Sequence, residues 1–241
     1  MVQNFTQCLK YYNTTYGLKN RSPQSLFLKW TAMKQHSSKK TVLDIIAIFF
    51  VKKVSNTFWE IADAWSYKNE KIARLYNNSI EEEYKKECQT YGLSSDSKVL
   101  HIGCGAYPLT DIVLAQCFQG AIVGIDKNPM AVRHAQEVIQ QHHLQNRIAV
   151  QQANGTEFPV DDFQLILISS CSLPKLQILE HLFKNGKHQS MIVVREISIA
   201  TADILQCIKT HPDIEIIQQI HHTPFPFYGP LGWDTFYLRK K

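Results

Sequence analysis

The chain has 241 residues, of which 44% are hydrophobic and 20% are charged. These are values of an ordinary globular protein, so they exclude a disordered or fibrous chain, and the length is enough to bury a large core. The formal net charge of +5 comes from scattered lysines and lacks the clustered basic face that a nucleic-acid groove requires.

The six cysteines form no C-x-x-C pair and no short, even framework of the kind that builds a disulfide scaffold or a zinc site. The first residues also lack the basic and then apolar pattern of a signal peptide, so we expect a reducing, cytoplasmic location. The longest apolar run, residues 42–51, is well short of the roughly 20 residues of a membrane span. It predicts a buried helix, with contact at a membrane surface as the alternative.

The N-terminal part of the chain has helical periodicity and no strand alternation. We therefore predict a helical region over residues 1–95, followed by a cofactor-binding domain over residues 96–241. The helices of the first region are expected at 25–30, 42–54, 58–65 and 72–88.

From residue 98 onward, short apolar runs alternate with amphipathic segments. Alternation of this kind predicts an α/β fold: a Rossmann-like, doubly wound sheet of seven strands, mostly parallel, with helices on both faces. A proline-rich connection before the last strand predicts that this strand runs antiparallel. Strands are expected at 98–102, 121–125, 147–152, 164–169, 190–195, 214–220 and 234–239, and helices at 108–118, 128–143, 174–185 and 201–210.

A glycine turn after the first of these strands predicts a nucleotide-type cofactor site. Gly103 and Gly105 leave room for backbone to approach a ligand, and Asp126, at the end of the next strand, can accept hydrogen bonds from two ribose hydroxyls. Pro108 stands where a dinucleotide-binding loop has its third glycine, and it removes a donor that a diphosphate would use. The pattern therefore favours S-adenosylmethionine over a dinucleotide.

Further cofactor contacts are expected from the neighbouring loops, because ligands of such sheets lie beyond the carboxyl ends of the strands. Asn154 is placed to read the adenine edge, although an Asn-Gly turn with Gly155 is also common without a ligand. The remaining candidates are Cys104 in the glycine loop, Lys127 beside the acidic residue and Ser169 after the fourth strand. Buried, inert thiol is the favoured interpretation of Cys104, against a nucleophile.

The loop after the fourth strand, residues 169–174, argues against two methyltransferase chemistries. It lacks the Asp/Asn-Pro-Pro-Tyr/Phe motif of enzymes that methylate nucleobase or glutamine amines, and it has no acidic residue to hold a catalytic magnesium ion. The pairs at 142–143 and 221–222 are adjacent histidines, whose side chains diverge, so neither makes a metal site alone. We predict no metal.

Three glutamates, Glu81 to Glu83, lie in the helix that leads into the glycine strand. Such a run is typical of a solvated helix face. Alternatively, one of the three is held in a closed site, where burial would equip it as a base.

The segment from Ile102 to Ala115 resembles nicotianamine synthase and its bacterial relatives that make opine-type metallophores. The resemblance includes Pro108-Leu109-Thr110. The segments starting at Gly124 and Met191 resemble further strands of that family. The resemblance covers residues 72–241 and implies a class I methyltransferase-like fold. The chain departs from the family's pattern at Cys104 and in its last strand.

The resemblance implies transfer of the 3-amino-3-carboxypropyl arm of S-adenosylmethionine to an amine, with Glu81 as the base and Tyr107 on the substrate side. The expected partner is then a small amine or amino acid, without nucleic acid or membrane. Methyl transfer to a small molecule is the alternative, because the sulfonium has three electrophilic carbons and the pocket decides which one meets the nucleophile. A cofactor-binding module that acts through a protein or RNA partner is the second alternative.

Overall fold

The computed structural model describes residues 53–54, 57, 61, 70–223 and 232–241. All of them fall within the unit formed by residues 43–241. The helices predicted at 25–30, 42–54 and 58–65 lie almost wholly outside the described part. No helix within that part is long and apolar enough to cross a membrane.

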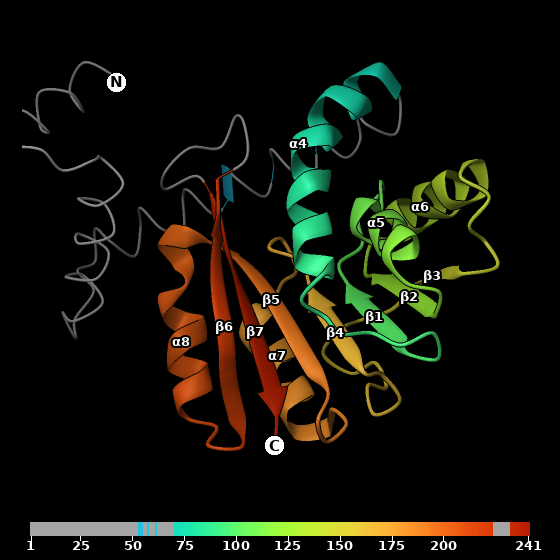
Figure 1. Cartoon of the computed structure of the whole chain (residues 1–241). Coiled ribbons are helices and arrows are strands. Elements are labelled where there is room, and N and C mark those ends of the chain that lie inside the picture. Colours follow the sequence, from blue (N-terminus) through green and yellow to red (C-terminus); the bar gives the residue numbers. More distant parts are fainter. Residues whose placement is uncertain (1–52, 55–56, 58–60, 62–69, 224–231) are drawn as a thin grey trace, which may run out of the picture. The chain divides into compact units, whose positions relative to one another are not determined.

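Seven strands form one mixed sheet, at the positions that the apolar runs predict. The strands are β1 (Lys98–Ile102), β2 (Ala121–Asp126), β3 (Ile148–Gln152), β4 (Leu165–Ile168), β5 (Met191–Ile197), β6 (Ile214–His222) and β7 (Trp233–Lys240). Their order in the sheet is β3-β2-β1-β4-β5-β7-β6 (Figure 1). β1 to β5 pair in parallel, and β7 runs antiparallel to both β5 and β6. The predicted fold and its final antiparallel strand are confirmed.

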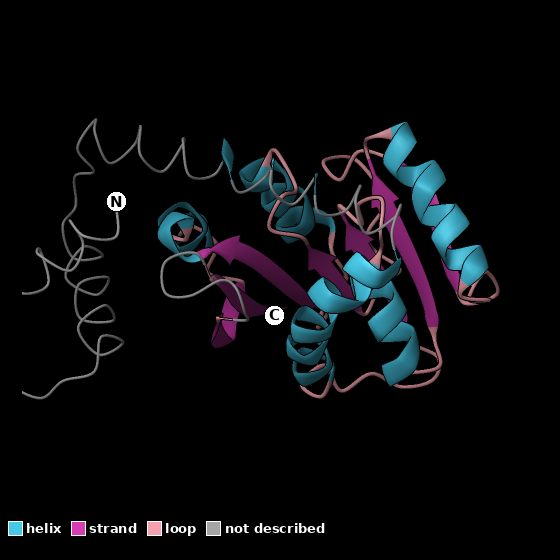
Figure 2. Cartoon of the chain, turned by 90° about the horizontal axis from the view of Figure 1, so that it is seen from above, coloured by secondary structure: helices cyan, strands magenta, loops and turns pink. Residues whose placement is uncertain are grey.

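Helices lie on both sides of the strands when the sheet is seen from above (Figure 2). They are α4 (Glu70–Cys88), α5 (Leu109–Cys117), α6 (Pro129–Gln141), α7 (Lys175–Asn185) and α8 (Ala202–Lys209), with a short 3-10 turn at Ser198–Ala200. Each of the four helices predicted after residue 98 is found within one or two residues of its expected ends.

Local sequence explains how these elements begin and where they lie. The Asn128 side chain accepts a hydrogen bond from the Met130 amide, and Pro129 occupies the first helical position, so α6 starts at a capped turn. In α5, every residue from Thr110 to Ala115 is buried, which suits a helix that is apolar nearly all round.

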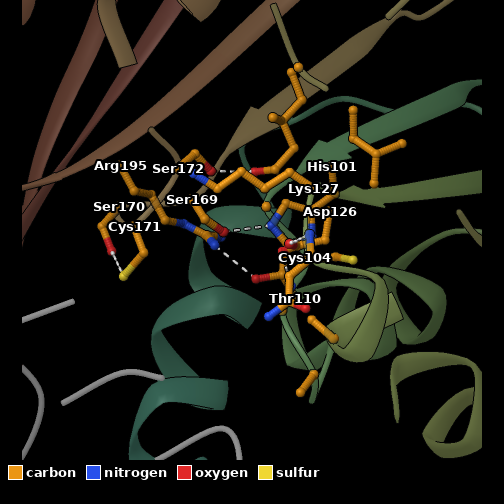
Figure 3. Close-up of a pocket in the computed structure, with 18 of the residues that line it drawn as sticks. His101, Cys104, Thr110, Asp126, Lys127, Ser169, Ser170, Cys171, Ser172 and Arg195 are labelled. Atoms are coloured by element: carbon orange, nitrogen blue, oxygen red, sulfur yellow. Dashed lines mark hydrogen bonds between the residues drawn. The ribbon is translucent and has the colours of Figure 1, made fainter. Parts of the chain in front are cut away.

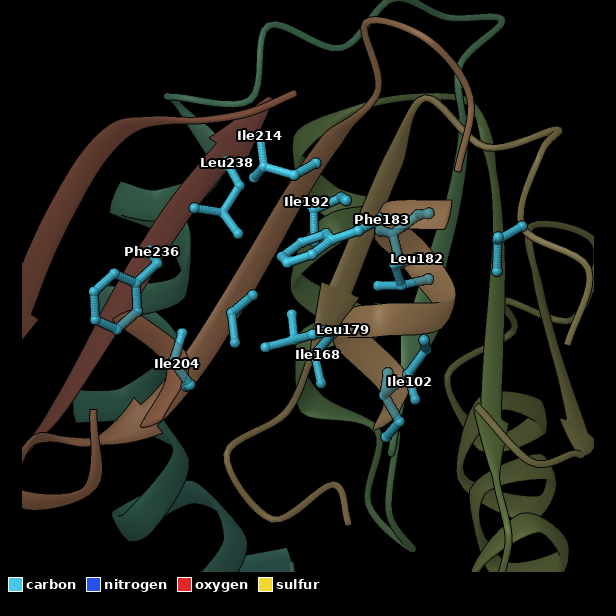
Figure 4. Close-up of a cluster of buried hydrophobic side chains, with 14 of the residues drawn as sticks. Ile102, Ile168, Leu179, Leu182, Phe183, Ile192, Ile204, Ile214, Phe236 and Leu238 are labelled. Carbon is cyan, nitrogen blue, oxygen red and sulfur yellow. The ribbon is translucent and has the colours of Figure 1, made fainter. Parts of the chain in front are cut away.

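Two apolar clusters fill the two faces of the sheet. The first packs α7 and α8 against the strands, with Leu179 of α7 beside Ile168, Phe183 of α7 beside Ile192, and Ile204 of α8 near Phe236 (Figure 4). The second packs α5 and α6 on the opposite face. Each fully buried side chain of this size contributes about 1.5–3 kcal/mol to stability.

The helix α4 packs against α5, although it precedes the domain boundary predicted at residue 95. Its residue Glu87 is buried and forms an ion pair with Arg195 of β5. Tyr91, which follows α4, belongs to the same apolar cluster as α5. This last helix of the predicted N-terminal region therefore forms part of the structure around the sheet.

Candidate active site

A cavity of about 480 Å³ opens at the carboxyl ends of β1, β2 and β4, where the strand order reverses. Its volume lies in the range of small-molecule sites, roughly 300–1,000 Å³. Nine of the residues predicted from the sequence line it: Gly103, Cys104, Gly105, Tyr107, Asp126, Lys127, Asn154, Gly155 and Ser169. Glu81 is not among the lining residues.

The glycine turn has the backbone conformation that the sequence predicts. Gly103 and Gly105 adopt φ angles of +80° and +71°, which side chains rarely tolerate. A Cβ atom on Gly103 would lie 2.1 Å from the Ser172 hydroxyl oxygen. The amides of Gly103 and Cys104 both donate to the Ile125 carbonyl, so the turn is fixed directly against β2.

Asp126 is held in place at the end of β2 by two backbone amides. The Gly105 amide donates to its Oδ2 at 3.1 Å, and the Asn128 amide donates to its Oδ1 at 2.9 Å. Each carboxylate oxygen retains a second lone pair for a ligand hydroxyl. The turn and the oriented carboxylate together fit the ribose and the amino-acid end of a nucleoside cofactor.

The other predicted cofactor residues also line the cavity, but they differ in burial and in hydrogen-bond partners. Gly155 is buried, and a Cβ atom there would lie 2.5 Å from Ile102, so the loop after β3 packs closely on β1. The Asn154 side chain accepts from the Thr156 amide, the turn geometry that also occurs without a ligand. Lys127 is exposed, and Cys104 is buried as expected. Their roles toward the cofactor stay predictions.

A chain of three polar side chains, of which His101 and Asp111 are buried and Ser169 is half-buried, ends in the cavity. His101 of β1 places its Nε2 2.8 Å from the Ser169 hydroxyl (Figure 3). Its Nδ1 lies 2.8 Å from Asp111 Oδ1. Asp111 is fully buried, and its Oδ2 has no hydrogen-bond partner within the described part of the chain. With Asp111 ionised, the His101 ring donates from Nδ1 and offers Nε2 to the serine as an acceptor. We call these three residues the relay.

Sequence reasoning found only Ser169 of the relay. Two signals were missed. His101 has apolar neighbours in β1, and Asp111 lies inside the apolar helix α5. Buried polar groups of this kind are rare unless they are hydrogen-bonded, so their presence in apolar runs marks a site.

A second polar network closes the cavity toward β5 and β7. Arg195 donates to Glu87 Oε2 from Nε at 3.1 Å and from Nη2 at 2.5 Å, and its Nη1 donates to Thr110. Thr235 donates to the other Glu87 oxygen, which also lies 3.2 Å from His222 Nε2 without hydrogen-bond geometry. Burial raises the pKa of Glu87, but the Arg195 charge and the hydrogen bonds outweigh it and lower that pKa to about 2.

The remaining wall of this end is apolar and aromatic. Ile80, Tyr84, Ile197 and Trp233 line it, with the Arg195 guanidinium 3.9 Å from the centroid of the Tyr84 ring. Because Glu87 neutralises that guanidinium, the end of the cavity presents little net charge.

The two residues predicted to be catalytic lie in different surroundings. Tyr107 lines the cavity, and its ring meets the His142 ring edge-on at 6.4 Å. Glu81 pairs instead with Lys85, at 2.8 Å. On the same helix, it is Glu83 that contacts the sheet, 2.8 Å from His222 Nδ1.

A family model described as a methyltransferase domain matches residues 93–224, more than half of the chain. The chain belongs to the methyltransferase-domain family. Its cofactor is S-adenosylmethionine, and the Gly103 turn and Asp126 fit it.

Solved structures share the fold. A geranyl diphosphate methyltransferase in complex with S-adenosylmethionine aligns with a TM-score of 0.56 at 8% identity, over 67% of this chain and 85% of the other. The cyclase SpnF aligns with a TM-score of 0.53 at 13% identity, over 65% and 81%. At these identities the likeness concerns the fold, which carries more than one reaction.

An uncharacterized protein of Haemophilus influenzae is 36% identical over 88 residues. The match spans 36% of this chain and 35% of the relative, so this chain covers about a third of that protein's length.

Replacing Asp126 by alanine is expected to weaken S-adenosylmethionine binding about 10–100-fold, because the charge-assisted hydrogen bonds to the ribose are together worth roughly 1.5–3 kcal/mol. Isothermal titration calorimetry with the folded variant measures this. Asp161→Ala, an exposed aspartate outside the cavity wall, is the matched control and should bind normally. Equal affinities for the two variants would remove Asp126 from the site.

Proposed function

We propose that this chain transfers the methyl group of S-adenosylmethionine to an oxygen or nitrogen of a small-molecule acceptor. The observation that carries the proposal is the continuity of one cavity. It runs from the glycine turn and Asp126, which we call the Asp126 cradle, past Ser169 to the aromatic end at Tyr84 and Trp233. A cofactor and an acceptor therefore have room to meet beside the relay.

The relay gives this cavity a way to take up the proton that the acceptor must lose. Ser169 Oγ accepts the proton of the acceptor's O–H or N–H group while its own proton passes to His101 Nε2. Asp111 then stabilises the positive imidazolium through Nδ1. S-adenosylmethionine supplies the electrophilic carbon on its sulfonium, so the products balance as methylated acceptor, sulfide and a proton on His101.

The aromatic end favours an acceptor with an apolar or aromatic body. The side chains of Ile80 and Ile197 offer dispersion contacts, and Arg195 is already neutralised by Glu87. An acceptor with several negative charges would find no unpaired cation there among the described lining residues of this end.

Aminocarboxypropyl transfer to an amine is the second candidate function. It is favoured by the resemblance of Ile102 to Ala115 and by the place of Tyr107 in the cavity wall. Under this candidate, Glu81 would have to leave Lys85 before it could act as the base.

Incubation with S-adenosylmethionine labelled separately in the methyl group and in the amino-acid arm tests both candidates. Offered a panel of small phenols, alcohols and amino acids, the protein should move the methyl label and release S-adenosylhomocysteine. Release of methylthioadenosine with transfer of the arm label would reject methyl transfer and establish the second candidate.

Substitution of His101 by glutamine should lower the turnover of the acceptor about 10²–10⁴-fold, the usual contribution of a positioned acid or base. Cofactor affinity should stay within a factor of a few, because His101 contacts Ser169 rather than the Asp126 cradle. Single-turnover assays and calorimetry separate the two effects. His188→Gln, at an exposed histidine, is the control. Full turnover in His101→Gln would show that the proton leaves by another route.

A further inference from the structure

A second cluster of reactive side chains lies on α7 and around the end of α8. Glu180 projects from α7, Cys207 from the last turn of α8, and His211 follows that helix. One ligand atom of each residue lies within 4.8 Å of the others. None of the three lines the cofactor cavity.

The surroundings of His211 fix which ring nitrogen carries hydrogen. Its Nδ1 lies 2.9 Å from the Cys207 carbonyl oxygen and 3.2 Å from the Thr210 hydroxyl, which itself donates to that carbonyl. Nδ1 must therefore be a donor. Histidines that bind metals are commonly oriented in this way, by a hydrogen bond from the second nitrogen to a carbonyl.

The other ring nitrogen then faces a carboxylate. His211 Nε2 lies 3.0 Å from Glu180 Oε2, and in the neutral ring both atoms present lone pairs. A second proton or a cation has to lie between them. The thiol of Cys207 is 3.6 Å from the other oxygen of Glu180, so a cation placed there would meet sulfur, nitrogen and oxygen together.

Although the sequence alone predicts no metal, we propose that Glu180, Cys207 and His211, which the fold brings together, bind one zinc ion. Thiolate, imidazole and carboxylate are the ligands that zinc takes, at about 2.0–2.3 Å, and three protein ligands leave one position for water. Small side-chain movements suffice, because the three ligand atoms already lie within 4.8 Å. Glu180 is on the exposed side of the cluster, so the ion has a path from solvent.

The proposed ion would link α7 to α8. Cys207 is buried, and an ordinary cysteine thiol, with a pKa of about 8.5, is protonated at neutral pH. Zinc binding should release that proton to solvent, and affinity should increase with pH. Because the ion binds only the folded pair of helices, it should also raise the melting temperature.

Titration of the reduced full-length protein with zinc, against a chromophoric chelator, tests the site. We expect one ion per chain and, with cobalt in place of zinc, a thiolate-to-cobalt charge-transfer band. Cys207→Ser and His211→Ala should each lower affinity at least about 100-fold, beyond the 10–100-fold cost of losing a ligand's supporting partner. Both variants should also lose the zinc-induced rise in melting temperature.

Cys117→Ser and His188→Ala are the controls, since both residues are exposed and outside the cluster. Cys8→Ser is a third control, because it removes the thiol that lies outside the described residues. The proposal is overturned if zinc fails to bind the wild type at micromolar concentration, which would leave Glu180 and His211 as an ion pair only. It is equally overturned if tight binding survives both Cys207→Ser and His211→Ala.

Discussion

Replacing Gly103 by alanine is expected to abolish measurable S-adenosylmethionine binding. The φ angle of +80° disfavours any side chain by roughly 1–2 kcal/mol, and the added Cβ would lie 2.1 Å from the Ser172 hydroxyl oxygen. Ser172 cannot move freely, because its hydroxyl donates to the Ile102 carbonyl at 2.8 Å. The turn must therefore shift, and with it the Gly105 amide that orients Asp126. Calorimetry on the folded variant measures the loss.

Gly92→Ala provides a matched control for the backbone strain alone. Gly92 has a φ of +59°, and no heavy atom lies within 4 Å of the position of an added Cβ. Gly92→Ala should lose about as much stability as Gly103→Ala loses from its backbone strain, but it should keep its cofactor affinity. Normal affinity in Gly103→Ala would show that the turn tolerates the displacement and that the cradle does not depend on it.

Replacing Glu87 by glutamine is expected to destabilise the protein by about 3–5 kcal/mol, the cost of breaking a buried ion pair. The isosteric amide leaves the Arg195 charge buried without its partner, in a pair whose side chains are 0% and 4% exposed. Urea unfolding followed by circular dichroism gives the difference in free energy.

The Glu87–Arg195 ion pair also predicts that the free energy of unfolding decreases in acid. The pKa of Glu87 falls from 4.5 to about 2 in the folded protein, so its ionised form stabilises the fold above the unfolded pKa. That contribution, about 3 kcal/mol at roughly 1.4 kcal/mol per unit of pKa, is lost as the pH falls through the interval from about 4.5 to about 2. The Glu87→Gln variant should lack this part of the pH dependence.

Glu82→Gln is the control on the same helix, because Glu82 is exposed and pairs only loosely with Lys85. Its unfolding free energy should change by less than about 1 kcal/mol. A Glu87→Gln variant as stable as Glu82→Gln would contradict the assignment of a buried, charged pair.

The fold was predictable because its signals are local. Strands β1, β2, β4 and β5 are short apolar runs, so β1 is predicted to the residue, and the apolar helix α5 is predicted to within one. The backbone part of the site was predictable for the same reason: Gly103, Gly105 and Asp126 are specified by turn and strand order.

The side-chain networks were not predictable, since they join residues that only the folded chain brings together. His101 meets Ser169 across 68 positions, and Arg195 meets Glu87 across 108. Likewise, the run of glutamates in α4 could not show which member faces the sheet, because each residue turns by about 100° around the helix axis. The structure places Glu83 against His222 and leaves Glu81 with Lys85.

A crystal structure with bound S-adenosylhomocysteine tests the central claim most directly. The claim is that the cavity between the glycine turn and Ser169 is the cofactor and transfer site. We predict that the ribose hydroxyls lie within hydrogen-bond distance of Asp126 and that the sulfur faces Ser169. A ligand bound outside this cavity, or with its sulfur turned away from the relay, would contradict the account.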